Sequence, residues 1–313
     1  MSRGASWEGA RRWSTILEVP NTLVHFAAQG AASHALWRRA DPRWIYLGCL
    51  LPDLPWILRR AVVALGLPVD GFDLRLYTMA QASLAGTLLL CGALALLTAA
   101  PRLVLATLGA NALFHLLLDA TEVKWGNGVH LLAPFSWRMT SFDLLPGESL
   151  VYRVLAIAGA ALLAWEIARR SRPTLGLDLR PKRLAAGGAL LAAYFLAPLF
   201  FLGAILASDS YSVKTLREVE ARPGRAIGLD RTAFVVTPAG GRIRLWTGEE
   251  VRASGPVPAH DATVSLHGTF LAPDVLRVDR LVEHHQDRDW PSYLALVLLA
   301  AVWARPLRRR APA

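Results

Sequence analysis

The sequence predicts an α-helical integral membrane protein of about 6–7 membrane helices with a small inserted all-β domain, OB-like or barrel-like. The first observation is composition, because 54% of the 313 residues are hydrophobic, against roughly 45–50% in soluble domains. The second is that these residues form long runs such as Thr78–Ala100, which contains no charged residue. The third is a polar, strand-like stretch at residues 208–289 that separates the last two apolar runs.

The apolar runs are long enough to cross a bilayer as helices, which takes roughly 20 residues. Continuous runs exclude the alternating pattern of membrane barrel strands. The two earliest stretches are shorter and contain polar residues, so we expect them to pack against protein rather than lipid. In chain order the candidates are Asn21–Trp37, Trp44–Leu58, Thr78–Ala100, Leu103–Leu118, Leu150–Ala168, Leu184–Ala207 and Trp290–Ala304.

Basic residues lie mostly at the ends of these runs and predict the topology. The net charge is +10, and positive residues favour the cytoplasmic side of membrane helices. We therefore predict a protein that crosses a bacterial-type inner membrane several times. The Arg-rich loop 169–183 is expected on the cytoplasmic side of that membrane. The same bias accounts for the charge, so nucleic acid is not an expected partner.

This topology divides the chain into four segments. Residues 1–20 lack the apolar run of a secretory signal peptide, and Ser6–Leu17 is predicted to lie as an amphipathic helix in the membrane interface. Residues 21–207 form the membrane helical domain, and residues 208–289 form an extracytoplasmic β domain. Residues 290–313 supply the last membrane helix and a basic cytoplasmic tail.

The β domain is predicted from short runs of strand-forming residues between turn signals. Thr232–Thr237 and Arg242–Trp246 flank a Pro-Ala-Gly-Gly turn, and Ala262–Leu271 and Val275–Val282 flank an Ala-Pro-Asp turn. We expect a small barrel or sandwich of about five strands. The last two runs resemble the closing strands of bacterial OB-type domains. Few aromatic residues stand among the basic ones, which disfavours single-stranded nucleic acid as a ligand.

Polar residues inside the apolar run Leu103–Ala120 are the first candidates for a functional site. Asn111, His115 and Asp119 follow one another at intervals of four and share one helical face. Polar groups within a membrane are costly and therefore functional candidates, and a His and a carboxylate one turn apart can ligate one ion. The alternative is a buried hydrogen bond that holds neighbouring helices together.

His25 and Asp53 are expected at the same membrane face as this stripe. Each lies near the outer end of one of the two short stretches, on either side of the basic join Arg38–Arg43. At about 1.5 Å per helical residue, the two ends reach a similar depth. A helix cap for His25 and a Pro-Asp-Leu-Pro turn for Asp53 are the alternatives, but the convergence of all these residues favours a functional site.

The segment after Asp119 offers two further candidates. Lys124 is suited to holding an anionic phosphate group as a point charge, with snorkelling toward the interface as the alternative. His130 is a candidate ligand or general acid–base catalyst near neutral pH. We therefore predict catalytic roles for both residues.

Three motifs and the early His25 occur together within about the first half of the chain: Leu50-Leu51-Pro52-Asp53, His115-Leu116-Leu117-Leu118-Asp119, and a loop from Gly128-Val129-His130-Leu131 to Trp137. They resemble the bacterial inner-membrane metal-dependent hydrolases, a family also described as LexA-binding, inner-membrane-associated hydrolases. The family is similar to the zinc-dependent phospholipase C and P1 nuclease group. The resemblance implies a divalent metal, zinc before others, bound by His25, Asp53, His115 and Asp119, and hydrolysis of a phosphoester.

One part of that family's pattern is missing. Members carry a His-Arg-Gly-x-x-His-Ser segment before the next helix, where this chain has residues 70–83 without a histidine. Gln81 and Ser83 are poor zinc ligands. Asp70 or Asp73 would be carboxylate substitutes, or they belong to a solvated loop.

Two functions are therefore expected. The first is a metal-dependent hydrolase that acts on a phosphoester or lipid-linked substrate, among membrane lipids, at the outer face of the inner membrane. The alternative is a non-catalytic membrane protein whose polar cluster is structural and whose β domain binds an envelope partner. A transporter is disfavoured, because the sequence shows no internal repeat and no pair of broken helices.

Overall fold

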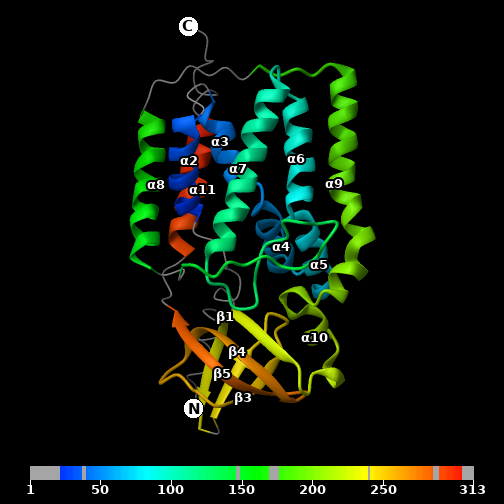
Figure 1. Ribbon diagram of the computed structural model, residues 1–313, viewed down its shortest axis with the longest axis vertical. Coiled ribbons are helices and arrows are strands. Elements are labelled where there is room, and N and C mark those ends of the chain that lie inside the picture. Colours follow the sequence, from blue (N-terminus) through cyan, green and yellow to red (C-terminus); the bar gives the residue numbers. More distant parts are fainter. Residues whose placement is uncertain are drawn as a thin grey trace.

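The computed structural model in Figure 1 shows a bundle of helices with a β-barrel at one end. It describes residues 22–36, 40–145, 149–168, 176–238, 240–284 and 289–304. The predicted interfacial helix within residues 1–20 lies outside these ranges. Within them, the predicted combination of helices and a small all-β domain is confirmed.

The bundle helices begin where the sequence supplies start signals. Pro42, Pro101 and Pro181 stand in first turns, where a missing N–H costs nothing. Asp70 and Ser83 cap their helices by accepting from backbone N–H groups. The helices are α2 (Thr22–Leu36), α3 (Pro42–Leu50), α4 (Leu54–Ala64), α5 (Gly71–Gln81), α6 (Leu84–Leu96), α7 (Pro101–Thr121), α8 (Leu150–Ala168), α9 (Pro181–Ala207) and α11 (Asp289–Ala304).

Three helices of the described residues, α7, α8 and α9, are long and apolar enough to cross a membrane. The pair α5 and α6 would add a fourth span, but it is bent by 65°. This is fewer than the predicted 6–7. The difference arises because the run Thr78–Ala100 is broken where Ser83 caps α6, and because α2, α3, α4 and α11 are shorter than a bilayer crossing requires.

Helix α7 stands between two groups of helices (Figure 1). On one side α2 packs against α3, α8 and α11, and on the other side α6 and α5 pack against α9. Helix α7 itself contacts α3, α6 and α2. Gly159 of α8 permits the close approach to α2, since a Cβ there would collide with the carbonyl of Leu23. The polar stripe of α7 therefore faces the interior of the bundle.

The barrel has five strands, as predicted, in the closed order β1-β2-β3-β5-β4. Its pairs are antiparallel except β3 with β5. Alternate residues such as Val264, Leu266 and Phe270 of β4 point into a buried apolar core. The strands are β1 (Ala226–Thr237), β2 (Gly240–Arg244), β3 (Glu250–Ser254), β4 (Ala262–Ala272) and β5 (Val275–His284).

A strained connection joins α9 to the barrel. It comprises η1 (Ser210–Ser212), α10 (Val213–Arg217) and η2 (Val219–Ala221). Tyr211 and Ser212 both have left-handed backbone angles, with φ of 56° and 54°. For residues with a Cβ this conformation costs roughly 1–2 kcal/mol each. Its consequence is to turn the Tyr211 side chain back toward the bundle, where its hydroxyl donates to the carbonyl of Gly128 at 2.6 Å.

Candidate metal centre

Three buried side chains, His25, His115 and Asp119, offer ligand atoms that all lie within 4.8 Å of one another. The Nε2 atom of His25 is 3.2 Å from Oδ1 of Asp119, and that of His115 is 3.9 Å from Oδ2. The two imidazole rings stack with centroids 3.9 Å apart. The group lies at the end of the bundle nearest the barrel. The group could hold a metal ion, as the sequence predicted.

Asp53 joins this group through His115. Its Oδ1 atom lies 3.4 Å from His115 Nε2, and its backbone precedes the first residue of α4. The α7 periodicity brings His115 and Asp119 to one face, and α2 and the α3–α4 turn bring the other two against it. All four predicted metal ligands thus lie together, with Asp53 beside His115 rather than within the tight three-residue group.

Asn111, the third member of the α7 stripe, has a different role. Its Oδ1 accepts from the hydroxyl of Ser33 at 3.1 Å, and its amide donates to the carbonyl of Thr107. This residue connects α7 to α2, as the helix-stapling alternative predicts. Gln29, one turn after His25, places its amide nitrogen 3.2 Å from His25 Nδ1 and thereby orients the imidazole.

The donor set fits a divalent cation. Within the described residues, Nδ1 of His115 and Oδ2 of Asp53 are buried without a hydrogen-bond partner. A buried polar atom left unsatisfied costs about 1–3 kcal/mol, and such atoms call for an explanation. Two imidazoles with one or two carboxylates form a ligand set typical of zinc and of similar divalent ions.

Lys124 lies directly against the group. Its Nζ atom is 2.9 Å from Oδ2 of Asp119, and the side chain is buried. Burial alone would lower the pKa of Lys124, but the neighbouring carboxylates of Asp119 and Glu122 outweigh it and hold this pKa above its usual range. The ammonium group therefore remains charged at neutral pH and supplies an electrostatic contact, not a proton acceptor.

His130 faces the same site from the loop after α7. Burial lowers its pKa to about 4, against a smaller opposing effect of the Trp137 backbone. Its imidazole is therefore neutral at pH 7. Tyr211 lies nearby, with ring centroids 6.3 Å apart, and burial raises the pKa of the Tyr211 phenol, which stays protonated.

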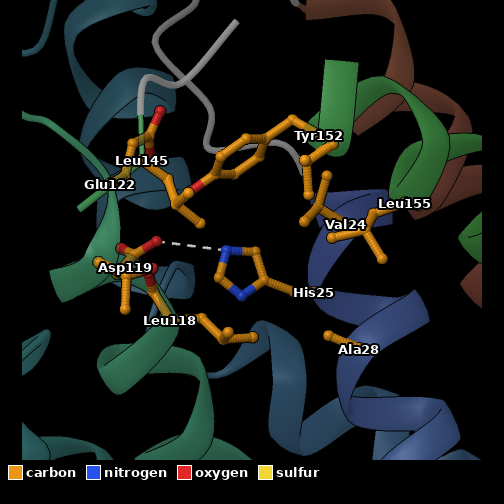
Figure 2. Close-up of a pocket in the computed structure, with 11 residues that line it drawn as sticks. Val24, His25, Ala28, Leu118, Asp119, Glu122, Leu145, Tyr152 and Leu155 are labelled. Atoms are coloured by element: carbon orange, nitrogen blue, oxygen red, sulfur yellow. Dashed lines mark hydrogen bonds and ion pairs between the residues drawn. The ribbon is translucent and has the colours of Figure 1, made fainter. Parts of the chain in front are cut away.

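Two cavities meet at Asp119. The first, shown in Figure 2, has its polar end at His25, Asp119 and Glu122. Its remaining walls come from α2, α7, Leu145 and α8: Val24, Ala28, Leu118, Thr121, Val151, Tyr152 and Leu155. The second cavity lies toward the barrel and is lined by Pro52, Asp53, Trp56, Met79, Ala82, His115, Leu116, Asp119, Gly128, Val129, His130 and Tyr211.

The residues proposed to replace the missing histidines do not reach this centre. Asp70 caps α5 at the backbone N–H of Asp73, and Asp73 pairs with Arg217 at 2.7 Å. Gln81 contacts the hydroxyl of Tyr77, and Ser83 caps α6. Within the described part of the chain, the metal-ligand candidates are therefore the four residues already named.

Sequence reasoning missed Tyr211 and Tyr152. Tyr211 lies ninety-two positions after Asp119 and reaches the site only through the left-handed connection, which no local pattern signals. Tyr152 stands at the start of an apolar run, where an aromatic residue is ordinary in a membrane interface. Gln29 could have been found, since it follows His25 by four residues.

Comparisons with protein-family models, curated proteins and solved structures yield no significant match. The resemblance to the inner-membrane hydrolases therefore rests on the motifs alone and stays a prediction.

Proposed function

We propose that this protein is a membrane-embedded, metal-dependent hydrolase of a phosphoester, with zinc as the metal. The observation that carries the proposal is the buried group of His25, His115 and Asp119, with Asp53 beside it. The motifs that carry the family resemblance support it, since Asp53, His115 and Gly128 line one cavity. We further propose a bacterial inner membrane, with an OB-like barrel on the extracytoplasmic side.

The balance of buried charge favours an anionic substrate. Asp53, Asp119 and Glu122 are buried carboxylates, and Lys124 and Arg75 are cations in the same region. Counted as formal charges, these five groups sum to one negative charge. A bound divalent cation would change this formal sum to one positive charge, which suits a phosphate group.

When bound, the metal would lower the pKa of a ligand water and polarise a phosphoryl oxygen. The chain supplies the remaining work. His25, His115 and Asp119 would hold the ion, and the charged Lys124 would orient the phosphate beside it. A general acid needs a proton at working pH, and His130, with a pKa of about 4, carries none at pH 7. We therefore propose that His130 orients the substrate by hydrogen bonding.

Metal analysis tests this proposal. Detergent-purified protein should contain stoichiometric metal that His115→Ala and Asp119→Ala both lose. His260→Ala and Asp274→Ala, which change exposed barrel residues, are matched controls and should retain it. Phosphate release from phosphatidic acid should follow the metal content. A wild-type protein that takes up no zinc, manganese or iron would refute the hydrolase.

The alternative is a non-catalytic protein whose polar cluster connects helices and whose barrel binds an envelope partner. One observation favours it: Asp119 already pairs with both His25 and Lys124. In that case the wild-type protein would contain no metal. The same alanine variants would then melt at a lower temperature than the wild type.

A further inference from the structure

The cavity of Figure 2 combines a polar end with apolar walls. The free space at this site is about 480 Å³, which includes solvent outside the cavity walls. Val24 and Leu155 line the side beyond His25, and Leu118 lies beside Asp119. A pocket for a water-soluble phosphate would need polar groups on several sides, because a buried phosphate must replace its hydration. These walls instead fit hydrocarbon.

The cavity opens beside Val151, an exposed lining residue at the start of α8. Helix α8 packs against α2 and α11, which stand between it and α7 in Figure 1. Val24, His25 and Ala28 of α2 line the cavity between the residues of α7 and α8, so α2 forms one of its walls. Leu117 and Val151 are 38% and 51% exposed on the two flanking helices. Since α7 and α8 are long enough to cross a membrane, this opening would face the hydrocarbon of a bilayer.

The second cavity begins on the other side of the same carboxylate. Asp119 lines both cavities, and His130 and Tyr211 line only the second. The metal-ligand candidates thus stand between an apolar, lateral opening and a more polar space beside the barrel. An amphiphile fits this order of environments, with its chain on one side and its headgroup on the other.

We propose that the groove between α7 and α8 binds one hydrocarbon chain of a lipid phosphate, whose phosphate group lies at His25 and Asp119. The proposal rests on the proposed function for the role of the phosphate, and names the substrate class as a membrane lipid that enters sideways. In Figure 2 the Tyr152 side chain extends toward Glu122 and Leu145. It closes the end of the groove and separates the chain from the aqueous side.

Photocrosslinking tests the groove without requiring activity. The probe is phosphatidic acid with a diazirine in one acyl chain, added to the full-length protein in phosphatidylcholine nanodiscs. Adducts are expected at Val151, Leu155 and Leu118, and excess unlabelled phosphatidic acid should suppress them. Adducts on α9, from ordinary contact with bilayer lipid, should not be suppressed.

Two variants block the groove. Ala28→Phe fills its floor, and Val151→Trp narrows its mouth at an exposed position that puts no strain on the core. The added side chain would occupy the space of the hydrocarbon chain, so we expect suppressible adducts to fall by about tenfold or more. Ala192→Phe and Val154→Trp, on exposed positions outside the groove, are the controls.

The outcomes separate this inference from the hydrolase. Suppressible adducts that persist in both blocking variants would refute the groove, as would adducts spread evenly over α7, α8 and α9. Suppressible adducts lost on blocking, in a protein that binds no metal, would support the groove and refute the hydrolase. Normal metal content in Ala28→Phe, together with lost adducts, would support both.

Discussion

Asp119 is the residue on which the charges of the site converge. Its oxygens lie 3.2 Å from His25 Nε2 and 2.9 Å from Lys124 Nζ. Asp119→Asn keeps the shape of the side chain and leaves the Lys124 ammonium buried beside a neutral amide. Removing one partner of a buried ion pair costs about 3–5 kcal/mol. We expect a clear fall in melting temperature and loss of bound metal.

The double variant Asp119→Asn with Lys124→Met is the control for that prediction. Because it removes both charges, much of the thermal stability should return while metal binding stays lost. If the single variant is as stable as the wild type in a detergent melt, the Lys124–Asp119 pair does not contribute as the structure indicates.

The buried imidazole of His130 should make the folding stability of the protein depend on pH. Its pKa of about 4 in the folded protein lies below the value near 6.5 of an unfolded chain. Between these values the unfolded state binds more protons, so the stability from neutral His130 is full above pH 6.5. It is lost progressively as the pH falls toward 4. The full difference amounts to about 3 kcal/mol.

His130→Leu isolates this contribution. Thermal melts of both proteins between pH 7 and pH 4 should show a steeper decline for the wild type. Parallel declines would mean that other groups dominate the acid sensitivity.

At the residue scale, the sequence predicted those site residues that recur at a regular spacing along one helix. His115 and Asp119 were found because a spacing of four defines a helical face. His25 and Asp53 were found by matching depth along two short helices. Tyr211 was not predictable, because its position depends on the left-handed backbone at residues 211 and 212, and the residues there carry no glycine signal.

At the scale of elements, the contact between α2 and α8 holds one wall of the site. A side chain at Gly159 would collide with the Leu23 carbonyl. Gly159→Val should therefore separate the helices and lower the unfolding free energy by about 1–3 kcal/mol. Detergent-titrated unfolding measures this.

Gly188→Val on α9 is the matched control. A Cβ at that position meets open space, so only a small change is expected, with part of it from helix propensity. Equal effects of the two substitutions would show that the α2–α8 approach is not critical.

Hydropathy correctly predicted which segments are apolar. It was less successful in predicting which of these segments are long enough, as single helices, to cross a membrane. The run Thr78–Ala100 reads as one span, yet Ser83 accepts from the N–H of Gly86 and begins a new helix. A Cβ at Gly86 would meet the carbonyls of Ala80 and Gln81, so the bend is closely packed. Hydropathy averaged over a window of residues does not detect a helix cap such as Ser83 or a small residue such as Gly86.

At the scale of the whole molecule, the barrel supports the site. The Arg75 guanidinium lies 4.4 Å from the Trp246 ring of the barrel and 5.2 Å from Tyr211, distances at which cation–π attraction is effective. On the other side, Asn127 donates to Asp230 of β1 at 2.8 Å. The loop that carries Lys124 is thus held against the barrel, although the two are about a hundred residues apart in sequence.

Gly228 of β1 provides a test of this support from within the barrel. A Cβ added there would lie 2.7 Å from the backbone N and Cα of Gly126, closer than any stable contact. Gly228→Ala should push the loop 123–130 away and displace Lys124 from Asp119. Outer residues that orient metal ligands typically contribute 10–100-fold to metal affinity, and we expect a loss of about tenfold.

Competition with a chelator measures the affinity, and hydrogen exchange of residues 123–130 should rise in parallel. Gly71→Ala is the control, since a Cβ there meets open space at the start of α5. Faster exchange with unchanged metal affinity would show that the loop is held by the barrel but does not position the site. Unchanged exchange would refute the contact itself. The expected pair of changes would mean that the barrel is part of the metal centre's scaffold.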